Sequence, residues 1–324
     1  MAKVLAYGEI DEEGRAVLAA RDGIEIVTVQ GDDPDGFSRE IADADALILR
    51  YHPFRRADVE RAEKLKVCAR YGVGYDNIDM EAATDCGIPV AVVGEANSVA
   101  VAEHTFYLML TAAKQGIRFD QAMRKEDWGF RTRIPAVEFW QKAILVVGFG
   151  RIGTRVAARA AAFEMDVMVY DPLLPAETIR DAGFTPVEDF SSALSDADYV
   201  TLHAPLTPDT RHMINADALA RMKPNAVLIN TARGGLVDET ALIEALGRGH
   251  LHGAGLDVFE NEPAIAGNPL LELPNTVLTP HIAGLSRECA ARMSIVSAQN
   301  ALDGIDGQLK PDLIVNRDVL SAAR

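Results

Sequence analysis

Residues 143–171 read AILVVGFGRIGTRVAARAAAFEMDVMVYD. The first apolar run predicts a buried strand, the alanine-rich run predicts a helix, and a second apolar run predicts another strand that ends at Asp171. Between the first strand and the helix, Gly148 allows a tight turn and Gly150 lets the backbone approach a pyrophosphate. Gly153 lets the helix pack closely, and the helix N-terminus then faces the phosphates. The stretch therefore predicts a dinucleotide site.

The spacing of these glycines is a weak signal by itself, and a glycine-rich turn is the alternative interpretation. The flanking strand and helix, and the acid at the end of the second strand, favour the dinucleotide. A carboxylate at Asp171 can bind both hydroxyls of an adenosine ribose and would repel a 2′-phosphate. Pro172 beside it offers no positive charge, so we expect NAD rather than NADP.

Length and composition limit the class of protein. A chain of 324 residues favours about two domains, and its 48% hydrophobic and 25% charged residues are ordinary for a globular protein. The net charge of −16 argues against a nucleic-acid-binding surface and is explained by solubility. No signal peptide precedes the first apolar run, and no run is long enough to span a membrane.

The chain has three cysteines, Cys68, Cys86 and Cys289, which are widely spaced and form no C-x-x-C pair. This pattern predicts reduced thiols in a cytoplasmic protein rather than a disulfide framework or a metal site.

Short apolar strands alternate with helical patterns on both sides of the fingerprint, which predicts parallel sheets. The first hundred residues hold no nucleotide fingerprint, so we expect them to serve the substrate. The fold class is therefore α/β, with two Rossmann-like or flavodoxin-like doubly wound parallel-sheet domains. We expect an NAD-binding domain at 99–286 and a discontinuous substrate domain formed by 1–98 plus 287–324.

A long apolar helix is expected from Ser98 to Lys114, with Ser98 as its N-cap. Glu103 and His104 lie inside it, and structural roles are favoured for them over catalytic ones. The polar, interrupted segment 118–139 is interpreted as a connecting arm, for which dimer contact is one use.

Three local motifs follow the fingerprint, and each begins at the end of a predicted strand, where ligands bind in open α/β sheets. Arg233 can grip a carboxylate, and His281 can give a proton to a carbonyl oxygen. Glu262 can hold the other nitrogen of that imidazole and favour its protonated form. Each residue alone has a structural explanation: a turn-capping arginine, a solvated loop acid or a structural histidine. Their shared position behind a dinucleotide fingerprint favours an acid–base set.

Seven motifs together resemble the D-isomer-specific 2-hydroxyacid dehydrogenases over nearly the whole chain. They are RYGVGYDNID (70–79), NSVAVAEH (97–104), GFGRIG (148–153) with the later aspartate, TLHAP (201–205), NTARGGLVDE (230–239), LDVFENEP (256–263) and TPHIAG (279–284).

The resemblance implies an NAD-dependent oxidoreductase that interconverts a D-2-hydroxy acid and its 2-keto acid, with Arg233, Glu262 and His281 as catalytic residues. It implies a homodimer joined through the NAD domain, and the charge and the lack of a long apolar run predict no nucleic-acid or membrane partner. The implied NAD-binding residues are Gly148, Gly150, Arg151, Ile152, Gly153, Asp171, His203, Ala204, Thr231, Ala232, Asp257 and Gly284.

Two branches of the family are similar to this chain. Arg50 and Arg70 fall where 3-phosphoglycerate dehydrogenases place arginines that meet the substrate phosphate, and backbone amides near Val73 and Gly74 are expected to hold the substrate carboxylate. The motifs LRYHP and IVNRDVL resemble the C-terminal-binding-protein group instead. The alternative function is thus an NAD(H)-sensing interaction module with weak dehydrogenase activity. Phosphohydroxypyruvate, hydroxypyruvate, glyoxylate and bulkier keto acids all stay open as substrates.

Overall fold

The computed structural model describes residues 1–264 and 267–322. The chain divides into two compact units: unit 1 comprises Met1–Asn97 with Leu285–Arg324, and unit 2 comprises Ser98–Gly284. Each unit is an α/β structure built on one wholly parallel sheet, as the alternation of strands and helices predicts. Among the described residues, no helix combines the length and the apolar character that a membrane span requires.

Unit 1 has a five-stranded sheet in the order β2-β1-β3-β4-β5. Its strands are β1 (Ala2–Tyr7), β2 (Ile24–Val29), β3 (Ala46–Leu49), β4 (Val67–Arg70) and β5 (Val90–Ala91). Its helices are α1 (Glu12–Ala19), α2 (Pro34–Glu40), α3 (Arg56–Arg61), α4 (Met80–Asp85), α12 (Arg287–Ile305) and α13 (Val319–Ala322).

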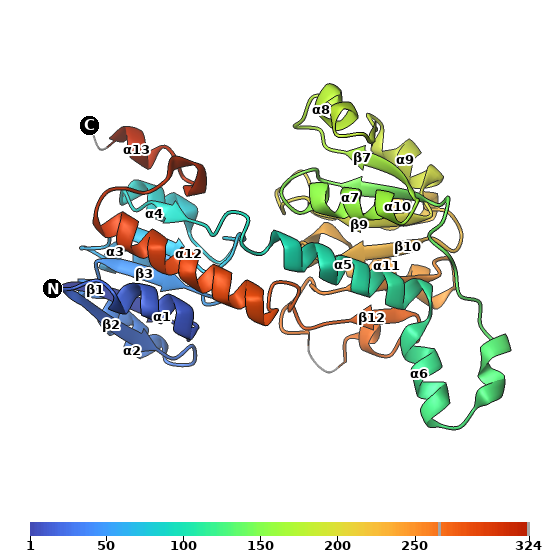
Figure 1. The fold of residues 1–324 in the computed structure, drawn as a ribbon, viewed down its shortest axis with the longest axis horizontal. Helices are drawn as coiled ribbons and strands as arrows, with labels where there is room; N and C mark the ends of the chain where they lie inside the picture. The colour runs from blue at the N-terminus through green and yellow to red at the C-terminus, as the bar shows by residue number, and fades with distance from the viewer. Residues whose placement is uncertain (265–266, 323–324) are drawn as a thin grey trace. The chain divides into compact units, whose positions relative to one another are not determined.

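Successive side chains of each strand point to opposite faces of the unit 1 sheet, and helices cover both faces. Helices α2, α3 and α4 contribute to the core on one face. On the other face, α12 lies beside α1 and against β3 and β4 (Figure 1). Glycines allow this close approach: a Cβ at Gly14 would lie 2.1 Å from the Ser294 hydroxyl, and one at Gly304 would lie 2.2 Å from Val67. The late helix is therefore an integral part of unit 1.

Unit 2 has a seven-stranded sheet in the order β12-β11-β10-β9-β6-β7-β8. Its strands are β6 (Ala143–Val147), β7 (Asp166–Tyr170), β8 (Thr185–Pro186), β9 (Tyr199–Leu202), β10 (Val227–Asn230), β11 (Gly253–Leu256) and β12 (Thr276–Leu278). Its helices are α5 (Ser98–Ala113), α6 (Gly116–Arg124), α7 (Gly153–Ala162), α8 (Ala176–Asp181), α9 (Phe190–Asp196), α10 (Ala216–Arg221) and α11 (Glu239–Gly247).

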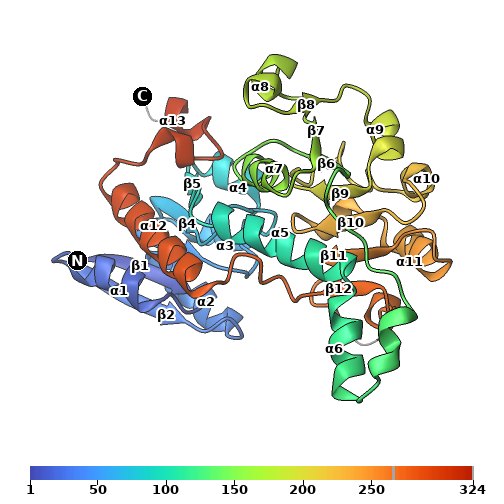
Figure 2. The same cartoon turned by 45° about the vertical axis from the view of Figure 1, so that its right-hand side comes forward.

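Two apolar cores cover the two faces of the unit 2 sheet. Helices α5 and α7 lie side by side on one face, and α9, α10 and α11 cover the other (Figure 2). The strands end at Val147, Leu202, Asn230 and Leu256, so the loops that follow them share the carboxyl edge of the sheet. This is the edge at which the sequence predicts ligand binding.

Two local expectations need correction. Ser98 is the first residue of α5 rather than its N-cap, and its hydroxyl accepts a hydrogen bond of 2.8 Å from Arg155 Nε. The segment expected to be a connecting arm contains α6 and a 3₁₀ turn at Trp128–Thr132. Only Ala122 of α6 is buried, although Phe119, Ala122 and Met123 are spaced as the apolar side of a helix, so α6 packs little of that side against the rest of the unit.

Candidate active site

The glycine-rich turn after β6 has the shape that a dinucleotide needs. Gly148 has a φ of +93°, and a Cβ there would lie 2.8 Å from the backbone of His203. A Cβ at Gly153 would lie 1.9 Å from the Gly148 carbonyl oxygen, so the start of α7 packs directly on the turn. Apart from Gly150 and its two chain neighbours, no described residue has an atom within 4 Å of the position of a Cβ at Gly150, so the backbone there faces open space. A pyrophosphate can approach the turn at this point.

Asp171 directly follows β7 and is held against the same turn. Its Oδ2 atom accepts a hydrogen bond of 2.8 Å from the Phe149 amide, and its Oδ1 atom accepts one of 3.0 Å from the Leu173 amide. The carboxylate is therefore oriented at the end of the strand beside the one that carries the glycines. This arrangement fits the adenosine side of a dinucleotide, because the acid stands where a ribose would present its hydroxyls.

The other residues implied in dinucleotide binding lie in loops at this carboxyl edge. His203 follows β9, and its Nε2 atom lies 2.9 Å from the Thr201 hydroxyl. Burial lowers the pKa of His203 to about 3, so its ring is neutral near pH 7. Thr231 follows β10, and its hydroxyl lies 3.0 Å from that of Thr105 on α5. The remaining members lie in the loops that follow β6, β9, β10, β11 and β12, namely Arg151, Ile152, Ala204, Ala232, Asp257 and Gly284.

His281 and Glu262 form a pair in the loops that follow β12 and β11. The Nδ1 atom of His281 lies 2.7 Å from Oε2 of Glu262, and the two side chains are 43% and 35% exposed. The second carboxylate oxygen of Glu262 accepts a hydrogen bond of 3.0 Å from the Phe259 amide. Burial opposes ionisation of Glu262, but the hydrogen bond and charge of His281 outweigh it and lower the pKa of the carboxyl. The pair can hold and transfer a proton while one ring nitrogen stays open to a ligand.

Arg233 lies in the loop after β10, next to the loop that carries Glu262. Its Nη1 atom donates to the Ala232 carbonyl at 2.6 Å, and its own carbonyl accepts from Asn230 Nδ2 at 2.8 Å. Its positive charge contributes to the lowered pKa of Glu262. A Cβ at Gly234 would lie 1.9 Å from the Phe259 carbonyl group, so only glycine lets the two loops touch. The three residues singled out from the sequence therefore lie in neighbouring loops of unit 2.

His104 also reaches this edge, although its position in an apolar helix favoured a purely structural role. Its Nε2 atom lies 2.9 Å from the Thr279 hydroxyl and 3.5 Å from Oδ1 of Asp257. Thr279 was not singled out from the sequence, and its place two residues before His281 was the only signal. Glu103, by contrast, is 66% exposed and lies 3.9 Å from Arg159. Of these two helical residues, only the histidine reaches the site.

In unit 1, Arg50 and Arg70 lie at the carboxyl ends of the neighbouring strands β3 and β4. The guanidinium of Arg50 lies 4.7 Å from the centre of the Tyr71 ring and 5.1 Å from that of Tyr51. Its Nε atom is buried without a hydrogen-bond partner among residues 1–264 and 267–322. Arg70 donates to the Tyr71 carbonyl. Val73 and Gly74, with backbone amides implied in binding, occupy the loop that follows β4.

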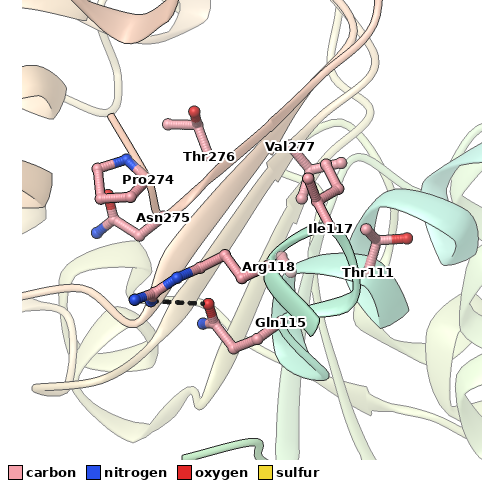
Figure 3. A pocket seen from close by; sticks show the side chains of 9 residues that line it. Thr111, Gln115, Ile117, Arg118, Pro274, Asn275, Thr276 and Val277 are labelled. Atoms are coloured by element: carbon pink, nitrogen blue, oxygen red, sulfur yellow. Dashed lines mark hydrogen bonds between the residues drawn. The ribbon is translucent and has the colours of Figure 1, made fainter. Parts of the chain in front are cut away.

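A small pocket of unit 2 lies elsewhere (Figure 3). Arg118 and Gln115, joined by a hydrogen bond of 3.2 Å, line it together with Asn275 and Thr276. Thr276 begins β12, whereas His281 follows the other end of that strand. The pocket is therefore separate from the cluster described above.

Comparison with known proteins agrees with this arrangement. Residues 106–283 match the family described as D-isomer specific 2-hydroxyacid dehydrogenase, NAD binding domain. The chain is 40% identical over 315 residues to a D-3-phosphoglycerate dehydrogenase of Methanocaldococcus jannaschii, which covers 97% of this chain and 59% of that protein. It is 38% identical over 329 residues to a glyoxylate reductase of Thermococcus litoralis, and the alignment covers 99% of this chain and 98% of that protein.

Solved structures give the same result. The D-lactate dehydrogenase of Aquifex aeolicus, solved with NAD and lactic acid, is 29% identical with a TM-score of 0.86 and covers 97% of this chain and 99% of its own. The chain spans 56–59% of the length of the phosphoglycerate dehydrogenases that it matches. The family match includes the glycine turn and the loops that carry Arg233, Glu262 and His281. The chain belongs to the D-isomer-specific 2-hydroxyacid dehydrogenase family, whose NAD-binding domain it contains.

Proposed function

We propose that this protein reduces a 2-keto acid to the corresponding D-2-hydroxy acid with NADH, and catalyses the reverse oxidation with NAD. The observation that carries the proposal is the contact of 2.7 Å between His281 Nδ1 and Glu262 Oε2, at the sheet edge that also holds the glycine turn. An imidazole paired with a carboxylate in this way is suited to general acid–base catalysis.

Bound NADH supplies the hydride. Glu262 accepts the hydrogen bond from Nδ1 of His281, so the Nε2 atom is the one that gives its proton to the carbonyl oxygen of the keto acid. In the direction of oxidation, Nε2 takes the proton back from the hydroxyl group. Arg233 binds the substrate carboxylate, because a guanidinium can donate two parallel hydrogen bonds to it. With Arg233 and His281 in neighbouring loops, the carboxylate and the reacting carbonyl of one small substrate are held together.

The test is an assay of NADH oxidation with glyoxylate, hydroxypyruvate, 3-phosphohydroxypyruvate and bulkier 2-keto acids. Turnover of any of them, giving the D-isomer of the product, supports the proposal. Inactivity with the whole panel, together with NADH-dependent association of the protein, would favour the alternative of an NAD(H)-sensing interaction module.

We further propose that the substrate is of the 3-phosphoglycerate type or of the hydroxypyruvate and glyoxylate type, and that a substrate with an anionic tail would meet the two arginines of unit 1. The relatives named above include both kinds of enzyme. In unit 1, the buried Nε atom of Arg50 has no acceptor among residues 1–264 and 267–322, and Arg70 lies on the adjacent strand, so two positive charges share one edge. The variant Arg50→Gln should lose more kcat/KM with 3-phosphohydroxypyruvate than with glyoxylate if these charges bind a phosphate.

Replacing Glu262 with glutamine should lower the pH above which keto-acid reduction fails. The Glu262 carboxylate lies 2.7 Å from Nδ1 of His281, and a negative charge at this position stabilises the proton that the ring must give to the substrate. Reduction needs that proton, so activity is present at low pH and lost as the pH rises. The neutral amide keeps the shape but not the charge, and the loss should occur at lower pH. The measurement is the pH profile of kcat/KM. An identical profile in the variant would mean that Glu262 does not influence the proton that His281 gives to the substrate.

Cofactor preference should depend on Asp171. The wild type should use NADH at least about 100-fold better than NADPH, because juxtaposed like charges cost several kcal/mol. Asp171→Asn keeps an acceptor for the Phe149 amide but removes the charge, so it should narrow that preference. The variant Asp166→Asn, at the other end of β7, is the matched control and should leave the preference unchanged. A wild type that prefers NADPH would contradict this role for Asp171.

We also propose that the protein is a cytoplasmic homodimer joined through unit 2. Four large apolar side chains are exposed on α5, α6 and the following 3₁₀ turn, namely Tyr107 (50%), Ile117 (40%), Met123 (53%) and Trp128 (63%). Helix α6 and the turn extend away from the unit 2 sheet (Figure 2). A second copy could cover these side chains. Light scattering should give twice the chain mass, and Trp128→Glu with Met123→Glu should shift the protein towards the monomer.

A further inference from the structure

Asp257 organises the backbone that carries His281. This aspartate is fully buried directly after β11. Its carbonyl accepts from the His281 amide at 2.8 Å, and its two carboxylate oxygens accept from the amides of Ile282 and Ala283 at 2.9 Å each. Three consecutive amides are thus held by one residue. His281 itself has a φ of +54°, a left-handed conformation that a residue with a Cβ rarely adopts, so the loop depends on these bonds.

The hydrogen bonds around Thr279 identify the donor on His104. Thr279 Oγ1 donates its one proton to Oδ1 of Asp257, at 2.5 Å. The same oxygen lies 2.9 Å from Nε2 of His104, and a hydroxyl that has given its proton can only accept there. His104 therefore carries a proton on Nε2. The chain of bonds runs from the helix α5, through Thr279, to the carboxylate that holds the His281 loop.

We propose that His104 is a positioning residue for His281: its Nε2–H group, acting through Thr279 and Asp257, keeps the His281 ring directed at Glu262. The expected effect on catalysis rests on the proposed function. The hydrogen bonds that connect the two histidines do not depend on the identity of the substrate. His104 is not placed in contact with substrate. Its side chain is 15% exposed, and its ring packs 5.3 Å from that of Tyr107.

The hydrogen bonds from His104 through Thr279 matter because the Asp257 carboxylate at their end is buried and charged. Burial opposes the charge of Asp257, but the His104 N–H group 3.5 Å away and the hydrogen bonds from Thr279 and the two loop amides outweigh it and keep the pKa of Asp257 low. Removing one donor leaves the remaining bonds to balance a buried charge, and the amides of Ile282 and Ala283 are the partners that can move. Movement there turns the backbone at His281 and draws Nδ1 away from Glu262.

The experiment compares His104→Leu, Thr279→Val and His104→Gln, whose amide nitrogen can donate in place of the imidazole. His252→Leu is the matched control, because His252 is a half-buried histidine of unit 2 whose Nε2 bonds Gln115 instead. The first readout is the ¹⁵N spectrum of the His281 ring in the free protein, which reports the proton on Nδ1. The second is kcat and KM with the best keto acid of the panel.

We expect His104→Leu and Thr279→Val to shift the His281 spectrum towards a mixture of both tautomers, as in an unconstrained imidazole. They should lower kcat about three- to tenfold, the size of one hydrogen bond's contribution, with KM little changed. His104→Gln should restore most of the wild-type His281 spectrum and of the wild-type kcat, and His252→Leu should alter neither the spectrum nor kcat.

A His281 spectrum that stays unchanged in His104→Leu would overturn the proposal, even if the variant were less stable. The proposal would also be overturned if His104→Gln did not restore the His281 spectrum and the kcat that His104→Leu changes. If the wild type turned over no keto acid, the proposed function would fail, yet the spectra would still decide whether His104 positions His281.

Discussion

The variant His281→Ala should lose about 10²–10⁴-fold in kcat for keto-acid reduction while it binds NADH as the wild type does. The methyl group cannot give a proton to the carbonyl oxygen, and removing the ring leaves the glycine turn and Asp171 untouched, because both lie at the ends of other strands. Steady-state kinetics measure the first effect, and titration calorimetry with NADH measures the second.

The matched control is His250→Ala, since the His250 ring bonds the Leu219 carbonyl at 3.0 Å and precedes β11 rather than following a strand end. This control should turn over normally. A His281→Ala enzyme with near-normal kcat would remove His281 from the proposed chemistry, and water would then have to supply the proton.

Arg233→Lys should lower kcat/KM about 10²–10³-fold with every keto acid, although the charge is kept. Lysine is a point charge on a flexible stem, whereas the planar guanidinium can bind both oxygens of a carboxylate at once. Truncating one partner of a hydrogen-bonded charge pair costs about 2–5 kcal/mol, and each 1.4 kcal/mol is tenfold.

The loss should appear with glyoxylate as well as with larger substrates, because the carboxylate is common to all of them. The exposed Arg248, changed to lysine, controls for the substitution itself. A loss confined to one substrate would mean that Arg233 recognises a tail rather than the carboxylate.

The sequence contains enough local information to predict the sheets and the dinucleotide turn. Gly148 and Gly153 occupy positions that no side chain can fill, and the apolar runs Ala46–Leu49, Tyr199–Leu202 and Val227–Asn230 form fully buried strands, so these sequence patterns are strong. The loops at the strand ends could also be predicted, because parallel strands direct them to one edge. The direct contact of Glu262 with His281 depends instead on the tertiary course of two loops 19 residues apart.

The link from His104 to Thr279 could not be predicted from periodicity. The two residues are 175 positions apart, and α5 is so apolar all round that its pattern does not mark one face. Its buried face is chosen by the packing of β11 and β12.

The insertion of unit 2 into unit 1 has a consequence for how the protein is made. At about 5–20 residues per second, the synthesis of residues 98–284 takes roughly 10 to 40 s. During that interval β3 and β4 have left the ribosome, but α12, which covers one of their faces, has not been made. Unit 2 can finish folding from a continuous stretch of chain while unit 1 waits. The newborn protein thus passes through a period in which an apolar sheet face needs temporary cover, and chaperones are the natural source of it.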